Sequence, residues 1–525
     1  MFTSGAQPTY NMLVVLLYMV VVAQAEFMTP IEHVVVLMLE NRAFDHMAGF
    51  FPNVDGLNGT EFNPYNTSNV TQGGVKVTKN SPYVSPIDPD HSTTATTSKI
   101  FGQDCLLKNS SSPGSCNTPK MDGFIEWEMK ARGHSVADAS KLMDMFTPER
   151  LPIMSTLASE FAIFDRFFAS HPGPTWPNRL FQIMGTSKGC TATSSRDPKT
   201  FLYFGKTIFD TVEEAGHSWR YYFKDAPLEA GLIAKLTFDP FKLRFWESFK
   251  KDAAEGKLPA FSWLNPRWFV DKKTNEGSSD QHPDHDVRLG EALIKEVYET
   301  LRSGKSWNKT ALIITYDEHG GFYDHVKPPM NVPAPDDIAS FPDKGFEFTR
   351  LGMRIPTLLV SPWVKKGSVI THPKPEEKPS PNSEYDLTSV ISTVKKMFNA
   401  PKFLTKRDAW SATFETRFNE LSKARTDCPM TLPPAPTSLG AAHAEKEAIL
   451  PLNHLQEDIV AHFHLLRRRS EMLKRSGNLD EPFDFEAERD LLPKTQGEAS
   501  DWISKIVREH LLAGAEAASN TMEEQ

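Results

Sequence analysis

The sequence alternates short apolar runs with amphipathic segments and turn-rich stretches. Residues 34–39 form a continuous apolar run that is rich in β-branched side chains and too short for a core helix, so the run predicts a fully buried strand. Residues 311–316 and 355–360 are expected to form further short strands, and the aromatic-rich stretch 261–269 is expected to contain another buried strand. Helices are expected at residues 287–301 and 385–398. Strands that alternate with helices over about 400 residues predict the α/β fold class, with a sheet covered by helices on both faces.

Two of the predicted strands end in polar pairs, Glu40-Asn41 after residue 39 and Asp317-Glu318 after residue 316. Ligands of open α/β sheets bind at the carboxyl ends of the strands. If both strands end at one edge of a sheet, three carboxylates and an amide converge there. Buried carboxylates repel one another and need a cation; oxygen ligands suit Mg²⁺, Ca²⁺ or Mn²⁺, while nearby imidazoles would admit Zn²⁺ or iron. The alternative for either pair alone is a helix cap or a surface ion pair.

A turn-forming run at residues 171–179 places Thr175 at a sharp bend before a helix. A hydroxyl held at a cation has its alkoxide form accessible at neutral pH and is able to attack phosphorus. His91, His282 and His285 lie in polar segments, where imidazoles can hold phosphoryl oxygens or protonate a leaving alkoxide. The plainer interpretations are that Thr175 is a turn residue and that each histidine is solvated.

His91 lies in a long segment that is expected to lack regular secondary structure. Residues 52–120 are dense in Gly, Asn, Ser, Thr and Pro, and so long an irregular segment indicates function or disorder rather than packing. The end of the chain differs again, because a proline-rich linker precedes polar amphipathic helices at residues 441–470 and 485–518. A basic patch at residues 467–475 fits either a solvated helix face or contact with an anionic membrane surface.

Composition narrows the class of protein. The chain has 525 residues and a formal net charge of −9, and neither this charge nor any long basic run indicates nucleic-acid binding. The hydrophobic segment 12–25 ends in Ala23-Gln24-Ala25 and predicts a secretory signal peptide, although its flank lacks Lys and Arg and an uncleaved anchor is the alternative. Export agrees with five glycosylation sequons, at Asn58, Asn66, Asn69, Asn109 and Asn308.

The four cysteines fit an oxidising compartment without making a disulfide scaffold. Cys105 and Cys116 flank a polar loop that a local disulfide would close. Cys190 and Cys428 either pair over a long range or stay free. A metal cluster is not expected, because no two cysteines have CxxC spacing.

Five motifs recur in one order between residues 31 and 401. They are ENRxFDH (40–46), GPTxPNR (173–179), HPxHDV (282–287), TYDEHGGFYDHV (315–326) and PTxLxSPW (356–363). Through them the chain resembles the phosphoesterase family of non-specific phospholipases C, which also includes bacterial acid phosphatases. Weaker likeness in the linker that begins at Cys428 suggests the plant-type, eukaryotic branch. Several long motifs in fixed order make the resemblance specific.

The resemblance implies an alkaline-phosphatase-like α/β fold. It also implies that Thr175 is the nucleophile and that His91, His282 and His285 lie near the phosphate. The metal or phosphate centre is expected at four residues: Glu40, Asn41, Asp317 and Glu318. One position departs from the family pattern, because Leu387 stands where the family usually has histidine. This change lowers activity or shifts substrate preference if that histidine acts in catalysis, and it is minor if the position only starts a helix.

We therefore expect a signal peptide at 1–25, a phosphoesterase catalytic domain at 26–427, a linker at 428–440 and a helical extension at 441–525. The expected activity is a phospholipase C that releases diacylglycerol and a phosphorylated head group through a phospho-threonine intermediate. Its partner is a phospholipid at a membrane surface, with no stable protein partner and with a divalent metal ion of open identity and requirement. The alternatives are an acid phosphatase for soluble monoesters and a non-catalytic secreted lipid-binding protein.

Overall fold

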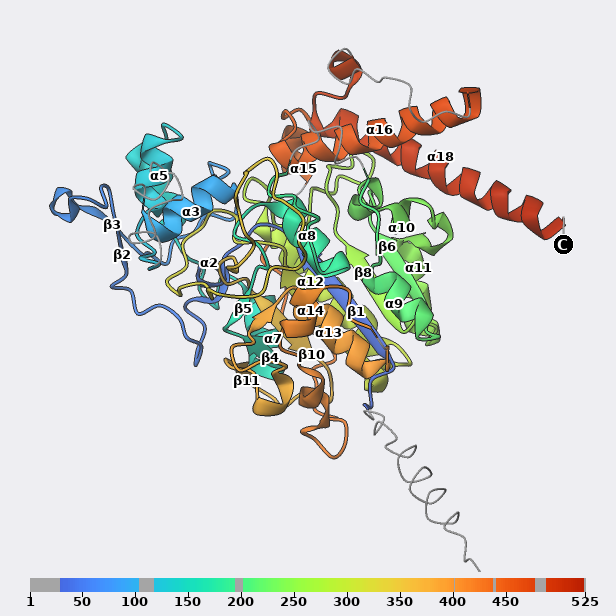
Figure 1. Cartoon of the computed structure of the whole chain (residues 1–525), viewed down its shortest axis with the longest axis horizontal. Helices are drawn as coiled ribbons and strands as arrows, with labels where there is room; N and C mark the ends of the chain where they lie inside the picture. Colours follow the sequence, from blue (N-terminus) through green and yellow to red (C-terminus); the bar gives the residue numbers. More distant parts are fainter. Residues whose placement is uncertain are drawn as a thin grey trace, which may run out of the picture.

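The first predicted strand lies at the centre of the molecule. The computed structural model describes residues 29–102, 118–193, 202–400, 402–437, 441–476 and 488–523. Within these residues β1 (His33–Leu39) pairs in parallel with β8 (Phe261–Asn265) on one side and β9 (Thr310–Tyr316) on the other. The three strands belong to an eight-stranded sheet of order β11-β4-β10-β9-β1-β8-β6-β7 (Figure 1). Its other members are β4 (Ala162–Phe164), β6 (Trp219–Phe223), β7 (Leu243–Phe245), β10 (Thr357–Val360) and β11 (Ser368–Ile370).

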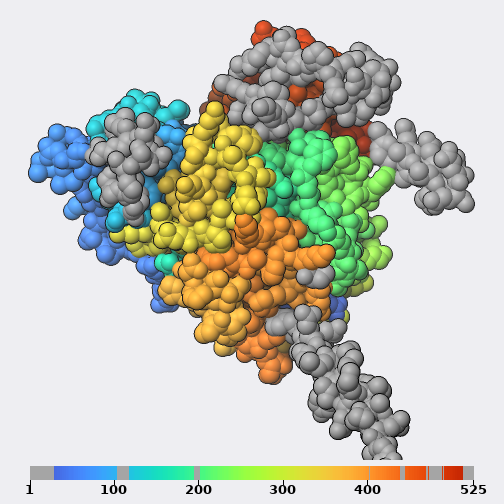
Figure 2. All heavy atoms as spheres, in the orientation of Figure 1, coloured from blue at the N-terminus to red at the C-terminus, as the bar shows by residue number. Residues whose placement is uncertain are grey.

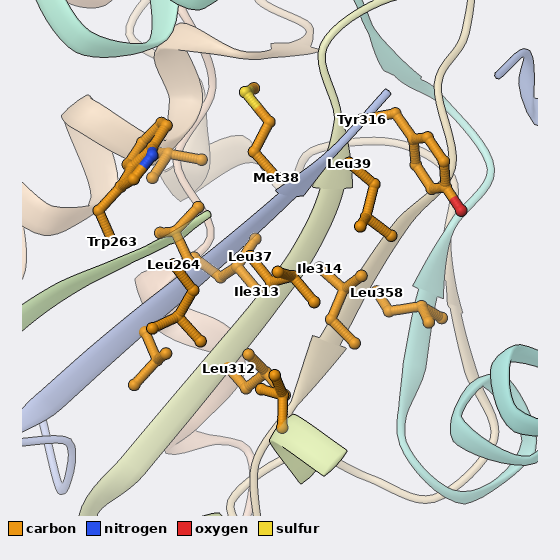
Figure 3. Close-up of a cluster of buried hydrophobic side chains, with 14 of the residues drawn as sticks. Leu37, Met38, Leu39, Trp263, Leu264, Leu312, Ile313, Ile314, Tyr316 and Leu358 are labelled. Atoms are coloured by element: carbon orange, nitrogen blue, oxygen red, sulfur yellow. The ribbon is translucent and has the colours of Figure 1, made fainter. Parts of the chain in front are cut away.

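The central strands are buried on both faces. Neighbouring residues of a strand point to opposite sides, and every residue of β8 and β9 is buried. Figure 3 shows apolar side chains of β1, β8, β9 and β10 packed beside one another. One group of contacting helices comprises α7 (Pro152–Glu160), α11 (Trp246–Glu255) and α12 (Val287–Ser303). A second group comprises α8 (Thr175–Met184), α9 (Ile208–Glu214) and α13 (Thr388–Met397). The predicted α/β class with helices on both faces is confirmed.

Local boundaries differ from the predicted ones in three places. The stretch 355–360 forms β10 only from Thr357, and β10 runs antiparallel to its neighbours β9 and β4, so the sheet is mixed. The stretch 385–398 begins with the short strand β12 (Tyr385–Asp386), which pairs with β5 (Phe167–Phe168), before α13 starts. Thr175 is the first residue of α8 rather than a turn residue ahead of it.

The long segment after β1 is more ordered than its composition predicts. It contains β2 (Phe62–Pro64), β3 (Gly74–Lys76) and α3 (Thr93–Phe101). The helix α3 reads TTATTSKIF, and four threonines give it a poor intrinsic helix propensity. Its start is fixed by Ser92, whose hydroxyl accepts a hydrogen bond from the backbone N–H of Ala95 at 3.2 Å. Burial of seven of its nine residues then stabilises a helix that local sequence disfavours.

Shorter helices complete the main body of the described chain. They are α2 (Phe44–Ala48), α5 (Phe124–Lys130), α6 (Val136–Ala139), α10 (Ala234–Thr237) and α14 (Lys406–Trp410). The linker does not stand away from this body: Tyr298 and Lys295 of α12 donate hydrogen bonds to the carbonyls of Pro429 and Leu432, at 2.6 and 2.7 Å. The helical extension contains α15 (Ala441–Ala448), α16 (His454–Ser476) and α18 (Gln496–Glu523), at one end of the molecule (Figure 1).

The structure tests only some of the predictions that concern export, disulfides and membrane crossing. The proposed signal segment, Cys105, Cys116 and Asn109 lie outside the described residues. Cys190 and Cys428 are both buried, and the structure does not join them in a disulfide. None of the helices in the described ranges combines the length and the apolar character that a membrane crossing requires.

Candidate active site

The ends of β1 and β9 meet at one edge of the sheet. The parallel register pairs Leu39 with Tyr316, so the polar pairs that follow emerge side by side. The backbone N–H of Asn41 donates to Oδ1 of Asp317 at 3.1 Å, and that of Arg42 donates to the carbonyl of Glu318 at 3.0 Å. Asn41 adopts a left-handed conformation with φ of 56°, which turns its amide toward the site. The structure thus brings together all four residues expected to form the centre.

A glycine allows this close approach. Gly320 has φ of +63°, and a Cβ added to it would lie 1.8 Å from the carbonyl oxygen of Asn41. Any side chain here would therefore push the end of β9 away from the end of β1. Glycine is needed at position 320 because the backbone of Asn41 occupies the place where a side chain would begin.

Arg179 supplies a positive charge inside the acidic centre. It lies four residues after Thr175 on α8, and therefore one turn further along the same helix face. Its guanidinium pairs with Glu40 at 2.7 Å, Asp317 at 3.3 Å and Glu229 at 2.5 Å, and all four side chains are buried. Two of the three carboxylates expected at the centre, Glu40 and Asp317, are therefore balanced by a cationic side chain of the chain itself. Burial nevertheless raises the pKa of Glu40 well above its usual value, against the lowering effect of Arg179.

Three oxygen atoms of the centre still lack a partner. Within the described part of the chain, no hydrogen bond reaches Oε2 of Glu40, Oδ1 of Asn41 or Oε1 of Glu318, although all three are buried. Burial, with the charge of Asp317, raises the pKa of Glu318 well above its usual value. Three buried oxygen atoms that accept no hydrogen bond fit the coordination of a hard divalent cation, which prefers oxygen ligands. These three residues would hold such an ion.

A second acidic group is already neutralised. Asp45, Asp324 and His325 place ligand atoms within 4.8 Å of one another, as a metal site requires. However, the guanidinium of Arg354 donates to Asp45 at 2.7 Å and to Asp324 at 2.9 Å. Because the buried guanidinium stands where a cation would balance the two carboxylates, this group serves to lock the fold rather than to bind metal.

The turn before Thr175 is held rigidly by one side chain. Oδ1 of Asn178 accepts from the N–H of His171 at 2.9 Å, while Nδ2 of Asn178 donates to the carbonyls of His171, Gly173 and Pro174 at 3.0 to 3.2 Å. A Cβ on Gly173 would lie 2.5 Å from the ring of His171, so the turn also needs glycine at this position. Thr175 is thereby fixed at the N-terminus of α8, where backbone N–H groups favour an anion.

Thr175 opens into a cavity of about 310 Å³. His91 and His282 line the same cavity, and both come from segments far from Thr175 in the sequence. Charged groups at its wall are Asp88, Asp90, Arg132 and Asp343, and the C-terminal extension contributes His454 and Leu455. The nucleophile candidate and two of the three candidate histidines therefore face one space.

His91 connects this cavity with the acidic centre. Its Nδ1 lies 2.7 Å from the carbonyl of Pro89, so Nδ1 carries the proton and Nε2 is the acceptor. Nε2 lies 3.4 Å from Nδ2 of Asn41 and 3.5 Å from Oε1 of Glu318. Burial lowers the pKa of His91, which favours the neutral ring. The geometry thus gives His91 an unprotonated nitrogen that faces the centre.

His282 has the opposite electrostatic environment. Its Nδ1 lies 2.5 Å from Oδ1 of Asp284, and its Nε2 lies 3.8 Å from Asp88. Burial by itself lowers the pKa of His282, but the carboxylates of Asp88 and Asp284 outweigh it and the pKa is raised overall. Two histidines of one cavity whose pKa values move in opposite directions are suited to acid and base roles.

His285 is set back from the cavity. Its Nδ1 bonds Asp280 at 2.7 Å, and its Nε2 lies 3.3 Å from the side-chain amides of Asn453 and Gln456 in the extension. Burial opposes the charged ring, but Asp280 and Asp284 raise the pKa of His285 to about 10. Its contacts support the loop that carries His282, so the structure does not bring His285 together with Thr175.

Two supporting residues were missed by the sequence analysis. Arg42 donates from Nε to the carbonyl of Gln281 at 2.7 Å and from Nη2 to the carbonyl of His282 at 3.2 Å, and so holds the His282 loop against the end of β1. Its place directly after Glu40-Asn41 was the available signal. Lys99 is fully buried, and the sequence did not point to it, because the helix that carries it was not predicted.

Lys99 joins three parts of the site. Its ammonium donates to the carbonyls of Asp90 and Gly321 at 2.6 and 3.0 Å and pairs with Glu128 at 2.8 Å. It therefore fixes the segment of His91 against the glycine turn beside the acidic centre.

Leu387 occupies a core position. It directly precedes α13 as the N-cap residue, is fully buried and belongs to the main hydrophobic cluster. It is not among the residues that line the cavity of Thr175. In this chain the position starts a helix and fills the core.

Comparison with known proteins gives consistent matches. The model of the phosphoesterase family matches residues 31–401. Non-specific phospholipase C6 of Arabidopsis thaliana is 43% identical over 418 residues, which cover 78% of this chain and 76% of the relative. Non-specific phospholipase C1 of the same plant is 41% identical, with 80% and 77% covered. Phospholipase C B of Mycobacterium tuberculosis is 27% identical, with 75% and 78% covered.

Similarity to solved structures is weaker. A protein of the alkaline phosphatase superfamily from Vibrio parahaemolyticus superposes with a TM-score of 0.29 and 12% identity, over 50% of this chain and 64% of that structure.

Proposed function

The chain belongs to the phosphoesterase family, and on this premise we propose that it is a phospholipase C that hydrolyses glycerophospholipids to diacylglycerol and a phosphorylated head group. One observation carries the proposal. Thr175, His91 and His282 line a single cavity, and His91 reaches from it to the acidic centre. A nucleophile, an acceptor nitrogen and an imidazole with a raised pKa around one space are the groups that phosphodiester cleavage needs.

In the first half of the reaction, Oγ of Thr175 attacks phosphorus and the bond between phosphorus and the diacylglycerol oxygen breaks. Nε2 of His91 takes the threonine proton, and His282 gives its proton to the leaving oxygen. The product is a phospho-threonine that still carries the head group. A divalent cation at Glu40, Asn41 and Glu318 would supply positive charge for the phosphoryl oxygens.

In the second half, water attacks phosphorus and the bond to Oγ of Thr175 breaks. The neutral His282 accepts a proton from the water, and His91 returns its proton to the threonine oxygen. Both histidines regain their starting states, and the phosphorylated head group leaves. The opposite environments of the two rings support this division of roles.

The test is replacement of Thr175. We expect Thr175→Ala to lower the rate of diacylglycerol release from phosphatidylcholine vesicles by a factor of about 10³ or more, because no nucleophile remains. Thr175→Ser keeps a hydroxyl at the same place and should retain measurable turnover. A folded Thr175→Ala enzyme with wild-type activity would overturn the assignment.

An acid phosphatase is the nearest alternative, because the same groups would cleave a soluble phosphomonoester. Parallel assays of vesicle hydrolysis and of p-nitrophenyl phosphate hydrolysis separate the two functions. Preference for the lipid by a factor of ten or more in kcat/KM supports the phospholipase.

We also propose that the chain enters the secretory pathway and is glycosylated. Asn58, Asn69 and Asn308 are exposed, as acceptor sites must be. A fall in apparent mass after treatment with an N-glycosidase, on protein secreted from eukaryotic cells, tests this proposal.

A further inference from the structure

An exposed apolar cluster lies at the start of the C-terminal extension. Ile449, Leu450 and Leu491 are 72%, 50% and 75% exposed. We call these three residues the apolar rim. Their two segments are joined, since the N–H of Leu452 donates to the carbonyl of Lys494 at 3.3 Å and the N–H of Gln496 donates to that of Leu450 at 3.1 Å. These hydrogen bonds bring the segment of Ile449 and Leu450 beside the segment that follows Leu491.

Ile449 and Leu450 of the apolar rim lie shortly before two residues that line the cavity of Thr175. Helix α16 begins at His454, and both His454 and Leu455 line the cavity. The intervening Asn453 donates from its side chain to both oxygens of Asp284, at 3.1 and 3.2 Å, which anchors this part of the extension beside His282. Figure 1 shows α15, α16 and α18 gathered at one end of the molecule, and Figure 2 shows part of this extension, in red, at the same end.

The cavity is suited to the polar part of a phospholipid only. Its volume of about 310 Å³ is at the lower limit for pockets that enclose a small ligand. Eleven of its sixteen lining residues carry charged, hydroxyl or imidazole side chains, and among the residues that line it Leu455 is the only large aliphatic one. The two acyl chains of a glycerophospholipid therefore do not fit inside. They must stay outside while the phosphate reaches Thr175.

We propose that the apolar rim inserts into the lipid bilayer and holds the mouth of the cavity against the membrane surface. The inference rests on the proposed function, because a lipid substrate is what gives the cavity mouth a membrane to face. Insertion keeps the acyl chains in the bilayer and lets the glycerol phosphate enter beside His454. Apolar side chains next to a polar cavity, with no charge cluster of one sign among them, fit a bilayer interface better than an anionic surface alone.

The test replaces the apolar rim with charge. In the triple variant Ile449→Glu, Leu450→Glu, Leu491→Glu we expect binding to phosphatidylcholine vesicles, measured by co-sedimentation, to weaken by about 1,000-fold, since each of the three buried aliphatic side chains contributes roughly a factor of ten. Vesicle hydrolysis should fall in parallel. Hydrolysis of a short-chain phosphatidylcholine below its critical micelle concentration should stay within about twofold of wild type, because the cavity is untouched.

Met430→Glu is the matched control. Met430 is 57% exposed and belongs to the linker that packs on the far end of α12, so its replacement should change neither vesicle binding nor hydrolysis. Wild-type vesicle binding by the triple variant would overturn the inference. A change from dimer to monomer in size-exclusion chromatography, without loss of vesicle binding, would show a self-association surface instead and would also overturn it. Loss of vesicle binding by the variant, with no lipid hydrolysis by the wild type, would refute the proposed function and leave the docking surface standing.

Discussion

Nη2 of Arg179 lies 2.7 Å from Oε1 of Glu40, and both side chains are fully buried. This contact ties the helix that begins at Thr175 to the end of the central strand. It also places a permanent positive charge where three carboxylates of the site would otherwise repel one another. The position of the nucleophile and the charge balance of the acidic centre therefore depend on one side chain.

Removal of that guanidinium should be strongly destabilising. The variant Arg179→Met removes the partner that Glu40, Asp317 and Glu229 share. Removing one member of a buried ion pair lowers the free energy of unfolding by about 3–5 kcal/mol. We expect a lower urea midpoint in equilibrium unfolding, with loss of activity. Arg179→Met combined with Glu229→Gln removes one of the stranded charges and should recover part of the stability. If the single variant unfolds at the wild-type midpoint, the ion pairs contribute nothing.

Two glycines with positive φ allow the cost of backbone strain to be separated from the cost of a steric clash. Gly320→Ala and Gly133→Ala both place alanine at positive φ, which costs about 1–2 kcal/mol. A Cβ at Gly133 meets nothing within 4 Å, whereas one at Gly320 meets the carbonyl of Asn41. We expect Gly133→Ala to stay active with a modestly lower Tm, and Gly320→Ala to lose kcat by more than tenfold. Equal activities of the two variants would contradict the close approach described for Gly320.

Lys99 is predicted to position His91 without touching substrate. Lys99→Met breaks the links to Asp90 and Gly321 and leaves Glu128 uncompensated, so both stability and kcat should fall. Adding Glu128→Gln removes the stranded charge and should restore much of the thermal stability. The kcat should remain low in the double variant, with KM little changed. Full recovery of kcat would show that Lys99 acts through stability alone.

The pH profile should report the acid role of His282. Because the pKa of His282 is raised, its ring keeps the proton to higher pH than an ordinary imidazole and loses it as pH rises further, so activity declines on the alkaline side. Asp284→Asn removes one charge that raises this pKa, and we expect the alkaline limb of kcat/KM to move to lower pH. Asp427→Asn, at an exposed site at the end of the main body, is the control and should leave the profile in place. An unmoved limb in Asp284→Asn would exclude His282 as the acid.

Cation binding is testable without an activity assay. If Glu40, Asn41 and Glu318 hold a divalent ion, Mg²⁺, Ca²⁺ or Mn²⁺ should raise the Tm, with a gain of about 2.7 kcal/mol when the ion is at a hundred times its Kd. Glu318→Gln should abolish the shift, although this variant relieves a buried carboxylate and should not be less stable without metal. An unchanged Tm of the wild-type protein with all three ions, after treatment with a chelator, would exclude the site.

Much of the fold was predictable from local sequence. The apolar runs that became β1 and β9 are continuous and bounded by polar residues, and burial on both faces leaves a strand of that kind little alternative. Their polar ends were predicted to meet, and the parallel register brings them together. The helix α3 was missed, because its threonines disfavour a helix locally and only tertiary burial stabilises it.

The sequence by itself determined which segments are strands, where the proline-bounded Thr175 lies and which acidic residues follow the central strands, because these features depend on neighbours within a few positions. Only the tertiary structure decided the partners of those residues. Arg179 meets Glu40 across 139 positions, and Asn453 of the extension meets Asp284 across 169. Opposite pKa shifts of His91 and His282 likewise follow from burial and from carboxylates that the fold brings near. Such energies depend on distance in space and on exclusion of water, and neither quantity is encoded in residue spacing.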